Sequence, residues 1–118
     1  MTRFYFAEAH KAKPGGRRID VPARLAGKEE LLDFLARAFP LPVYFGHNWD
    51  ALEECLLDLD WLAGPEVDLV HHDLPLATTP PDQLLYLRIL AAAAAASPRL
   101  HVIFPAASRA AIEKLLAR

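Results

Sequence analysis

Four acidic side chains in one short segment carry the most informative chemistry in the sequence. Asp50, Glu54 and Asp58 recur at intervals of four residues, and Glu53 lies beside them. On a helix this spacing places the side chains on one face, where like charges cost about 0.2–0.5 kcal/mol per pair. Asp58 also lies near the expected end of the helix, where the helix dipole disfavours an anion. The pattern favours a functional anionic face, and a merely solvated helix face is the alternative.

The same carboxylates could bind a divalent cation together with His47, which precedes them. Metal sites need ligands that converge from several elements, and the spacing His-Glu-x-x-His is absent from the sequence. His71 and His72 end an expected strand, so their side chains point to opposite faces. We expect neither a metal nor another cofactor, and a metal-dependent enzyme using carboxylates and histidine is kept as an alternative.

Other catalytic machinery is not visible in the sequence. There is no Gly-x-Ser-x-Gly motif, no phosphate-binding glycine loop and no dinucleotide fingerprint. Cys55 shares an apolar helix side with Leu52 and Leu56, which indicates a buried structural thiol. An acid–base pair of Asp50 with Glu54 would need one carboxyl that stays protonated, and no residue pattern indicates this. We therefore expect a protein that is not an enzyme.

The elements that must position the acidic stripe follow from apolar periodicity and from helix stop signals. Helices are expected at residues 27–39, 48–59, 80–96 and 107–118, with Asn48 as the N-cap of the second. Strands are expected at residues 3–7, 67–70 and 100–104, and residues 19–21 form either a further strand or the far arm of a hairpin. Strands joined through helices usually lie parallel. The sequence thus predicts an α/β fold with a small, mostly parallel three-stranded sheet and four to five helices.

Length and composition suit one domain over residues 1–118. The chain has 118 residues, of which 53% are hydrophobic, so a core large enough to fold alone is available. It has a single cysteine, no signal-peptide pattern and no apolar run long enough to span a bilayer. We expect a cytoplasmic protein that does not enter membranes.

Charge is divided unevenly along the chain. Residues 38–87 contain nine acidic and no basic side chains, whereas seven of the 13 basic residues lie among the first 28. A strongly negative surface repels phosphate backbones and attracts cationic proteins. We expect a cationic protein partner and no nucleic acid.

The segment from Leu41 to Leu56, LPVYFGHNWDALEECL, closely resembles the signature of the barstar family. Barstar is a bacterial intracellular inhibitor of a secreted guanyl-specific ribonuclease, and the order of the later helices and strands fits the same family. The resemblance implies a barstar-like fold and inhibition of a ribonuclease. It also implies that Tyr44, Gly46, Asn48, Asp50 and Glu54 occupy positions that contact the enzyme, with Glu54 in place of the substrate phosphate.

Other positions depart from the family pattern. Glu53 stands where the family has a contacting tryptophan, Asp58 where it has a glycine, and Ala92 where it has an acidic contact. Trp49 would either supply aromatic contact area or pack against the sheet. The expected partner is a different cationic ribonuclease or nuclease toxin, and an interaction module without ribonuclease inhibition is the alternative. The sequence leaves the oligomeric state open. The predicted partner-binding residues are Tyr44, Gly46, Asn48, Trp49, Asp50, Glu53, Glu54 and Asp58.

Overall fold

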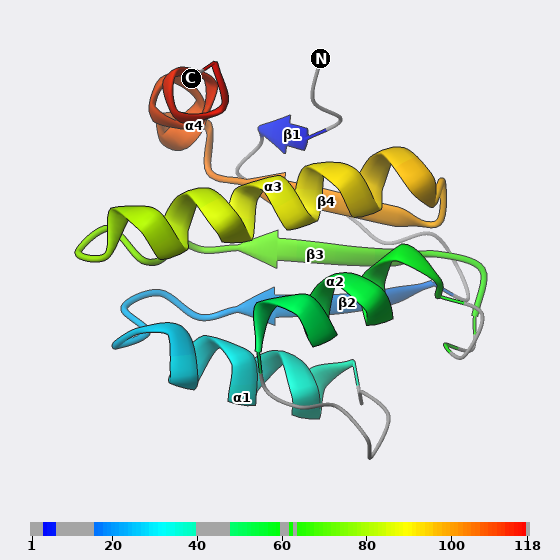
Figure 1. The fold of residues 1–118 in the computed structure, drawn as a ribbon. Helices are drawn as coiled ribbons and strands as arrows, with labels where there is room; N and C mark the ends of the chain where they lie inside the picture. The colour runs from blue at the N-terminus through cyan, green and yellow to red at the C-terminus, as the bar shows by residue number, and fades with distance from the viewer. Residues whose placement is uncertain (1–3, 7–15, 40–47, 60–61, 63, 118) are drawn as a thin grey trace.

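A parallel sheet forms the scaffold of the molecule (Figure 1). The computed structural model describes residues 4–6, 16–39, 48–59, 62 and 64–117. Within them, four strands lie in the order β1-β4-β3-β2, and every ladder is parallel. The strands are β1 (Phe4–Phe6), β2 (Arg17–Val21), β3 (Val67–His71) and β4 (Leu100–Phe104). The predicted α/β class with a parallel sheet is confirmed, and the sheet has four strands instead of the predicted three.

The additional strand is β2, at one edge of the sheet. Ile19 and Val21 are buried while Arg18 and Asp20 are exposed, which is the alternation of a strand with one covered face. Ile19 lies opposite Leu69 of β3 in a parallel register. The hairpin alternative is wrong, because β1 pairs with β4 at the opposite edge.

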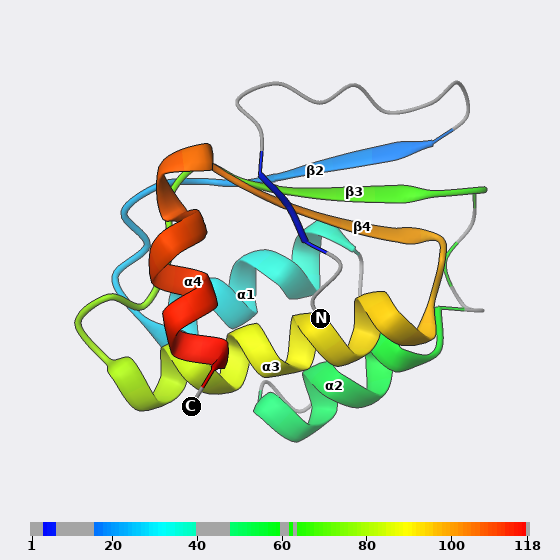
Figure 2. The same ribbon diagram turned by 90° about the horizontal axis from the view of Figure 1, so that it is seen from above.

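Helices α1, α2 and α3 lie on the same face of the sheet (Figure 2). The helices are α1 (Lys28–Ala38), α2 (Trp49–Leu57), α3 (Pro80–Ala96) and α4 (Arg109–Leu116). These bounds agree with the predicted helices to within two residues, and the last helix is preceded by a short 3-10 turn, η1 (Ala106–Ser108). None of the helices in the described residues is long and apolar enough to cross a membrane.

The core lies between the sheet and this helical layer. Leu69 and Val102 of the central strands are fully buried, as are Leu52 of α2 and Leu90 of α3. The alanine run at the end of α3 contributes Ala93 and Ala94 to the same core. Alanine side chains allow close helix packing, and α2 lies along α3 in both ribbon views (Figures 1 and 2).

His71 is a buried titratable group at the end of β3. Its Nδ1 lies 3.0 Å from the carbonyl oxygen of Ile103 and its Nε2 lies 2.7 Å from the hydroxyl of Tyr86. Because a carbonyl can only accept, Nδ1 carries the proton and Nε2 accepts from the tyrosine. Burial lowers the pKa of His71 to about 3. His72 is exposed beside Asp20, which confirms that the two histidines point to opposite faces.

The buried histidine makes the stability of the protein dependent on pH. The unfolded chain binds a proton on this imidazole near pH 6.5, whereas the folded chain does so only near pH 3. The free energy of unfolding should therefore fall as the pH decreases from 6.5, with a slope of up to about 1.4 kcal/mol per pH unit from this group. Urea unfolding between about pH 7 and pH 5 measures this slope, and it should be smaller in His71→Gln. Equal slopes in the two proteins would contradict the assignment.

Candidate functional site

Helix α2 has one buried side and one acidic side. Trp49, Leu52, Cys55 and Leu56 are buried in the core. The other side carries four carboxylates, of which three are exposed and that of Glu53 is partly buried. We call this surface the acidic face, and it consists of Asp50, Glu53, Glu54 and Asp58. The fold thus keeps the predicted stripe together on one exposed surface.

The start of α2 is fixed by its N-cap. Asn48 has an extended backbone, and its Oδ1 accepts a hydrogen bond from the backbone N–H of Ala51 at 2.8 Å. This bond satisfies one of the amide groups that a helix leaves unpaired at its N-terminus. Asp50 lies in the first turn, where the helix dipole stabilises an anion. The predicted N-cap is confirmed, and it holds the end of the helix from which Asp50 projects.

Trp49 anchors the same end of α2 to the rest of the fold. Its side chain is only 8% exposed, and its indole N–H donates to Asp82 of α3 at 3.1 Å. Its ring lies 6.0 Å from that of Tyr86, and the Lys28 ammonium lies 5.6 Å from its centre. These contacts give Trp49 a packing role. Its contact with a partner stays a prediction.

Cys55 belongs to the buried side of α2. The thiol is buried, as the sequence predicted, and it forms no disulfide. Burial raises the pKa of Cys55, and the negative charge of Glu54 raises it further. A thiol in this environment stays protonated and is a poor nucleophile. Cys55 therefore serves packing, and the chemistry of α2 lies with its carboxylates.

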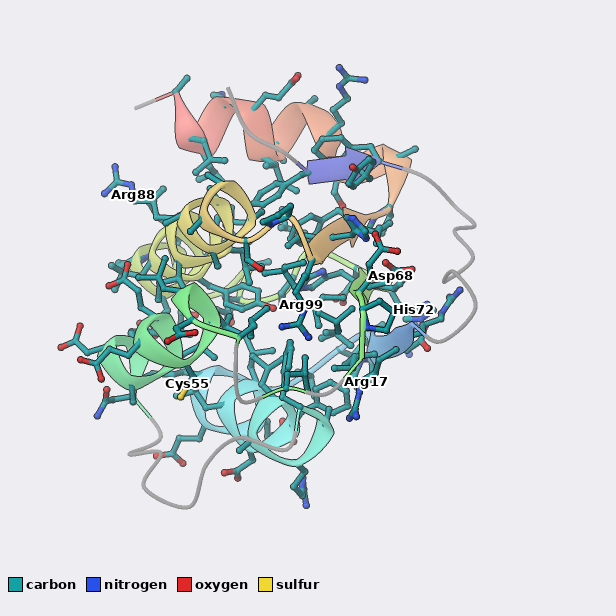
Figure 3. All side chains as sticks on the ribbon, turned by 90° about the vertical axis from the view of Figure 1, so that its right-hand side faces the viewer. Arg17, Cys55, Asp68, His72, Arg88 and Arg99 are labelled. Carbon is teal, nitrogen blue, oxygen red and sulfur yellow. The ribbon has the colours of Figure 1, made fainter. Side chains whose placement is uncertain are left out.

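Four other acids of the segment 38–87 have partners inside the fold. These pairs are Asp68 with His101 Nδ1 (2.9 Å), Glu66 with His101 Nε2 (3.5 Å), Asp73 with the backbone N–H of Arg24 (2.9 Å) and Asp82 with the Trp49 indole (3.1 Å). Asp68 lies on the sheet face turned away from the helices (Figure 3). By contrast, no basic side chain of the described residues forms an ion pair with Asp50, Glu53 or Glu54. These three carboxylates remain available to a cationic ligand.

Some of the residues predicted for a metal site or for partner contact lie in the loop before α2, outside the described residues. Among the described residues, no three His, Cys, Asp or Glu side chains lie close enough to hold a metal ion. Tyr44, Gly46 and His47 lie outside the described residues. The predicted roles of Tyr44 and Gly46 as contacts therefore stay predictions.

One residue that the sequence reasoning did not place in the site is Leu57. Its side chain is 40% exposed on α2, between the acidic residues and directly before Asp58. Its spacing of three from Glu54 and seven from Asp50 could have placed it on the acidic side. The acidic face thus includes an apolar neighbour, and mixed surfaces of this kind are typical of protein interfaces.

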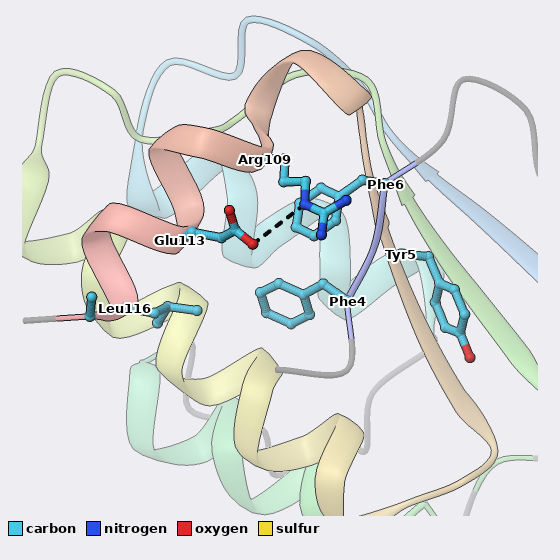
Figure 4. Close-up of a pocket in the computed structure, with 7 residues that line it drawn as sticks. Phe4, Tyr5, Phe6, Arg109, Glu113 and Leu116 are labelled. Carbon is cyan, nitrogen blue, oxygen red and sulfur yellow. Dashed lines mark hydrogen bonds and ion pairs between the residues drawn. The ribbon is translucent and has the colours of Figure 1, made fainter. Parts of the chain in front are cut away.

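A separate pocket lies between β1 and α4 (Figure 4). Its walls include Phe4 and Phe6 of β1 and Leu116 of α4. The guanidinium of Arg109 lies 5.6 Å from the centre of the Phe6 ring and pairs with Glu113 at 3.4 Å. The pocket thus combines one ion pair with largely apolar walls.

Comparison with protein families identifies a model that matches most of the chain. The family model described as Barstar (barnase inhibitor) matches residues 17–106, which is more than half of the chain. The matched range includes the acidic face and three of the four strands, and it excludes β1 and α4. A search of curated proteins finds no match.

Removal of the N-cap should destabilise the protein. In Asn48→Ala the amide of Ala51 loses its side-chain partner, so the free energy of unfolding should fall by about 1 kcal/mol. Asn48→Asp retains a capping oxygen and should stay close to wild type. Urea unfolding of the three proteins measures the difference. Equal stability of Asn48→Ala and wild type would show that this bond contributes nothing.

Proposed function

The chain belongs to the barstar family, and we propose that it is an inhibitor that blocks the cationic active site of a ribonuclease or nuclease toxin. The acidic face of α2, with the loop that precedes it, is the proposed contact surface. The observation that carries the proposal is a capped helix that presents three exposed carboxylates on one surface while its other side is buried. The family is that of a barnase inhibitor, so it suggests a ribonuclease as the class of partner.

The chemistry of a ribonuclease explains why an acidic helix would block it. An enzyme that binds RNA must present cationic side chains to the phosphates, and carboxylates form strong charge-assisted hydrogen bonds with such groups. Glu54 lies between Asp50 and Asp58 along the helix, so it would take the place of the phosphate at the centre of the contact. Because α2 is already folded and capped, little conformational entropy would be lost on binding.

Two differences from the family pattern favour a partner other than barnase itself. Glu53 adds a carboxylate where the family has a tryptophan, and it is partly buried beside the exposed acids. Ala92 is exposed on α3, where the family has an acidic contact. The proposed surface is therefore more acidic on α2 and lacks this charge on α3, which would suit a differently arranged set of cations.

Substitution of the central acids tests the proposed surface. Glu54→Ala and Asp50→Ala should each weaken binding to the cognate ribonuclease by about 2–5 kcal/mol, because each leaves a buried cation of the enzyme unpaired. Glu29→Ala, which removes an exposed acid from the first turn of α1, is the matched control and should bind like wild type. Calorimetry and inhibition assays against a panel of bacterial ribonucleases measure these changes.

Equal binding by wild type and all three variants would contradict the site. If no ribonuclease of the panel binds the folded wild type, the result favours an interaction module without ribonuclease inhibition. Titration of the folded protein with Mg²⁺, Mn²⁺ and Zn²⁺ in the calorimeter separates the metal-dependent alternative, which requires measurable heat.

The association rate should depend strongly on salt. Charges on an exposed acidic face attract a cationic enzyme over about one Debye length, which shortens from about 30 Å at 0.01 M salt to about 8 Å at 0.15 M. Stopped-flow measurements should show an association rate that falls as salt increases. Asp58→Asn should make this fall less steep, and it should leave the dissociation rate nearly unchanged. A rate that does not vary with salt would argue against electrostatic steering by the acidic face.

A further inference from the structure

Arg99 connects the turn before β4 to the chain that leaves α2. Its guanidinium donates hydrogen bonds, through Nε, Nη1 and Nη2, to four backbone carbonyls of this segment. The acceptors are Leu59 (Nη1, 2.8 Å), Leu62 (Nη2, 2.7 Å), Gly64 (Nη2, 2.6 Å) and Pro65 (Nε, 3.3 Å). In Figure 3 the side chain of Arg99 lies over the body of the molecule, whereas that of Arg88 projects from its edge. Arg99 is partly buried and Arg88 is exposed. One side chain thus satisfies four carbonyls that follow the acidic helix.

The end of α2 has no cation of its own. Residues 38–87 contain no Lys or Arg, and the last turn of α2 carries no basic side chain. A helix leaves its last carbonyls unpaired and its C-terminus partly negative, and here Asp58 adds a carboxylate at the C-cap. Arg99 brings a positive charge to this region from a turn about 40 residues later in the chain.

The backbone of Arg99 is also fixed. Its carbonyl accepts a hydrogen bond from the N–H of Val67, at the start of the central strand β3, at 2.8 Å. The guanidinium therefore projects from a point tied to the sheet. Because its donors form a planar fork, the carbonyls around it are held in defined directions, which the three donors of a flexible lysine cannot reproduce.

We propose that Arg99 is a positioning residue for the acidic face. It ties the chain after Asp58 to the sheet and so holds the last turn of α2, with Glu54 and Asp58, in the orientation that the partner binds. This inference rests on the proposed function, because it assigns the acidic face as the contact surface. Arg99 itself acts through the backbone that it holds.

Hydrogen exchange and binding together test this role. Arg99→Met removes the donors and keeps an apolar side chain, Arg99→Lys keeps the charge, and Arg88→Met makes the same change at an exposed site on α3. Amide exchange over residues 55–59 should accelerate in Arg99→Met about tenfold more than exchange in β3 and β4, because four carbonyls lose a charged donor. The exchange rate of Arg99→Lys over these residues should lie between those of wild type and Arg99→Met. The exchange rate of Arg88→Met should match that of wild type.

Binding is measured with the ribonuclease of the bacterial panel that wild type binds most tightly, at a temperature where every variant is folded. The dissociation constant should rise about tenfold in Arg99→Met, through faster dissociation, and less than twofold in Arg88→Met. Acceleration of α2 exchange by the same factor as β3 and β4 would overturn the inference, since it would indicate general destabilisation. If wild type binds no ribonuclease of the panel, that result counts against the proposed function, and the exchange comparison still decides whether Arg99 holds the last turn of α2.

Discussion

The burial of one side of α2 is the interaction on which the candidate site depends. Leu52 and Leu56 are fully buried, and each such side chain contributes about 1.5–3 kcal/mol relative to exposure. Repulsion between like charges on the opposite side costs only about 0.2–0.5 kcal/mol per pair. The helix can therefore keep Asp50, Glu54 and Asp58 together in water, because the burial of its apolar side stabilises the fold by more than the repulsion between these charges costs.

The fold uses the acids of residues 38–87 in two different ways. Some form contacts inside the fold: Asp82 accepts a hydrogen bond from the indole of Trp49, and Asp68 pairs with His101. Those on α2 face outward, and two cations of the described residues near this helix have other partners. Lys28 lies over the Trp49 ring, and Arg99 is occupied by backbone carbonyls. In the described part of the chain, these two cations therefore have partners other than the carboxylates of α2.

The local sequence pattern was sufficient to predict α2 and its N-cap. It could not predict contacts between residues that are far apart in the chain. The burial of Trp49 could have been read from its spacing to Leu52 and Leu56, which is that of one helix side. Its bond to Asp82, 33 residues away, could not. The same holds for β1 and β2, whose neighbours in the sheet come from the distant strands β4 and β3. The nine acids of residues 38–87 could be counted in the sequence. Only the tertiary contacts show which of them have partners inside the fold and which are exposed.

The two elements outside the matched family range pack against β4 and α3. Strand β1 covers the edge of β4 and packs Phe4 against Phe104, with ring centres 5.2 Å apart. Helix α4 buries Ile112 beside α3. Because α3 carries α2 as well, each contact that immobilises α3 also reduces the freedom of the acidic face. The proposed inhibition, in which a carboxylate replaces a phosphate, would depend on this rigidity, since a misplaced charge in a closed cleft loses its hydrogen bonds and keeps its desolvation cost.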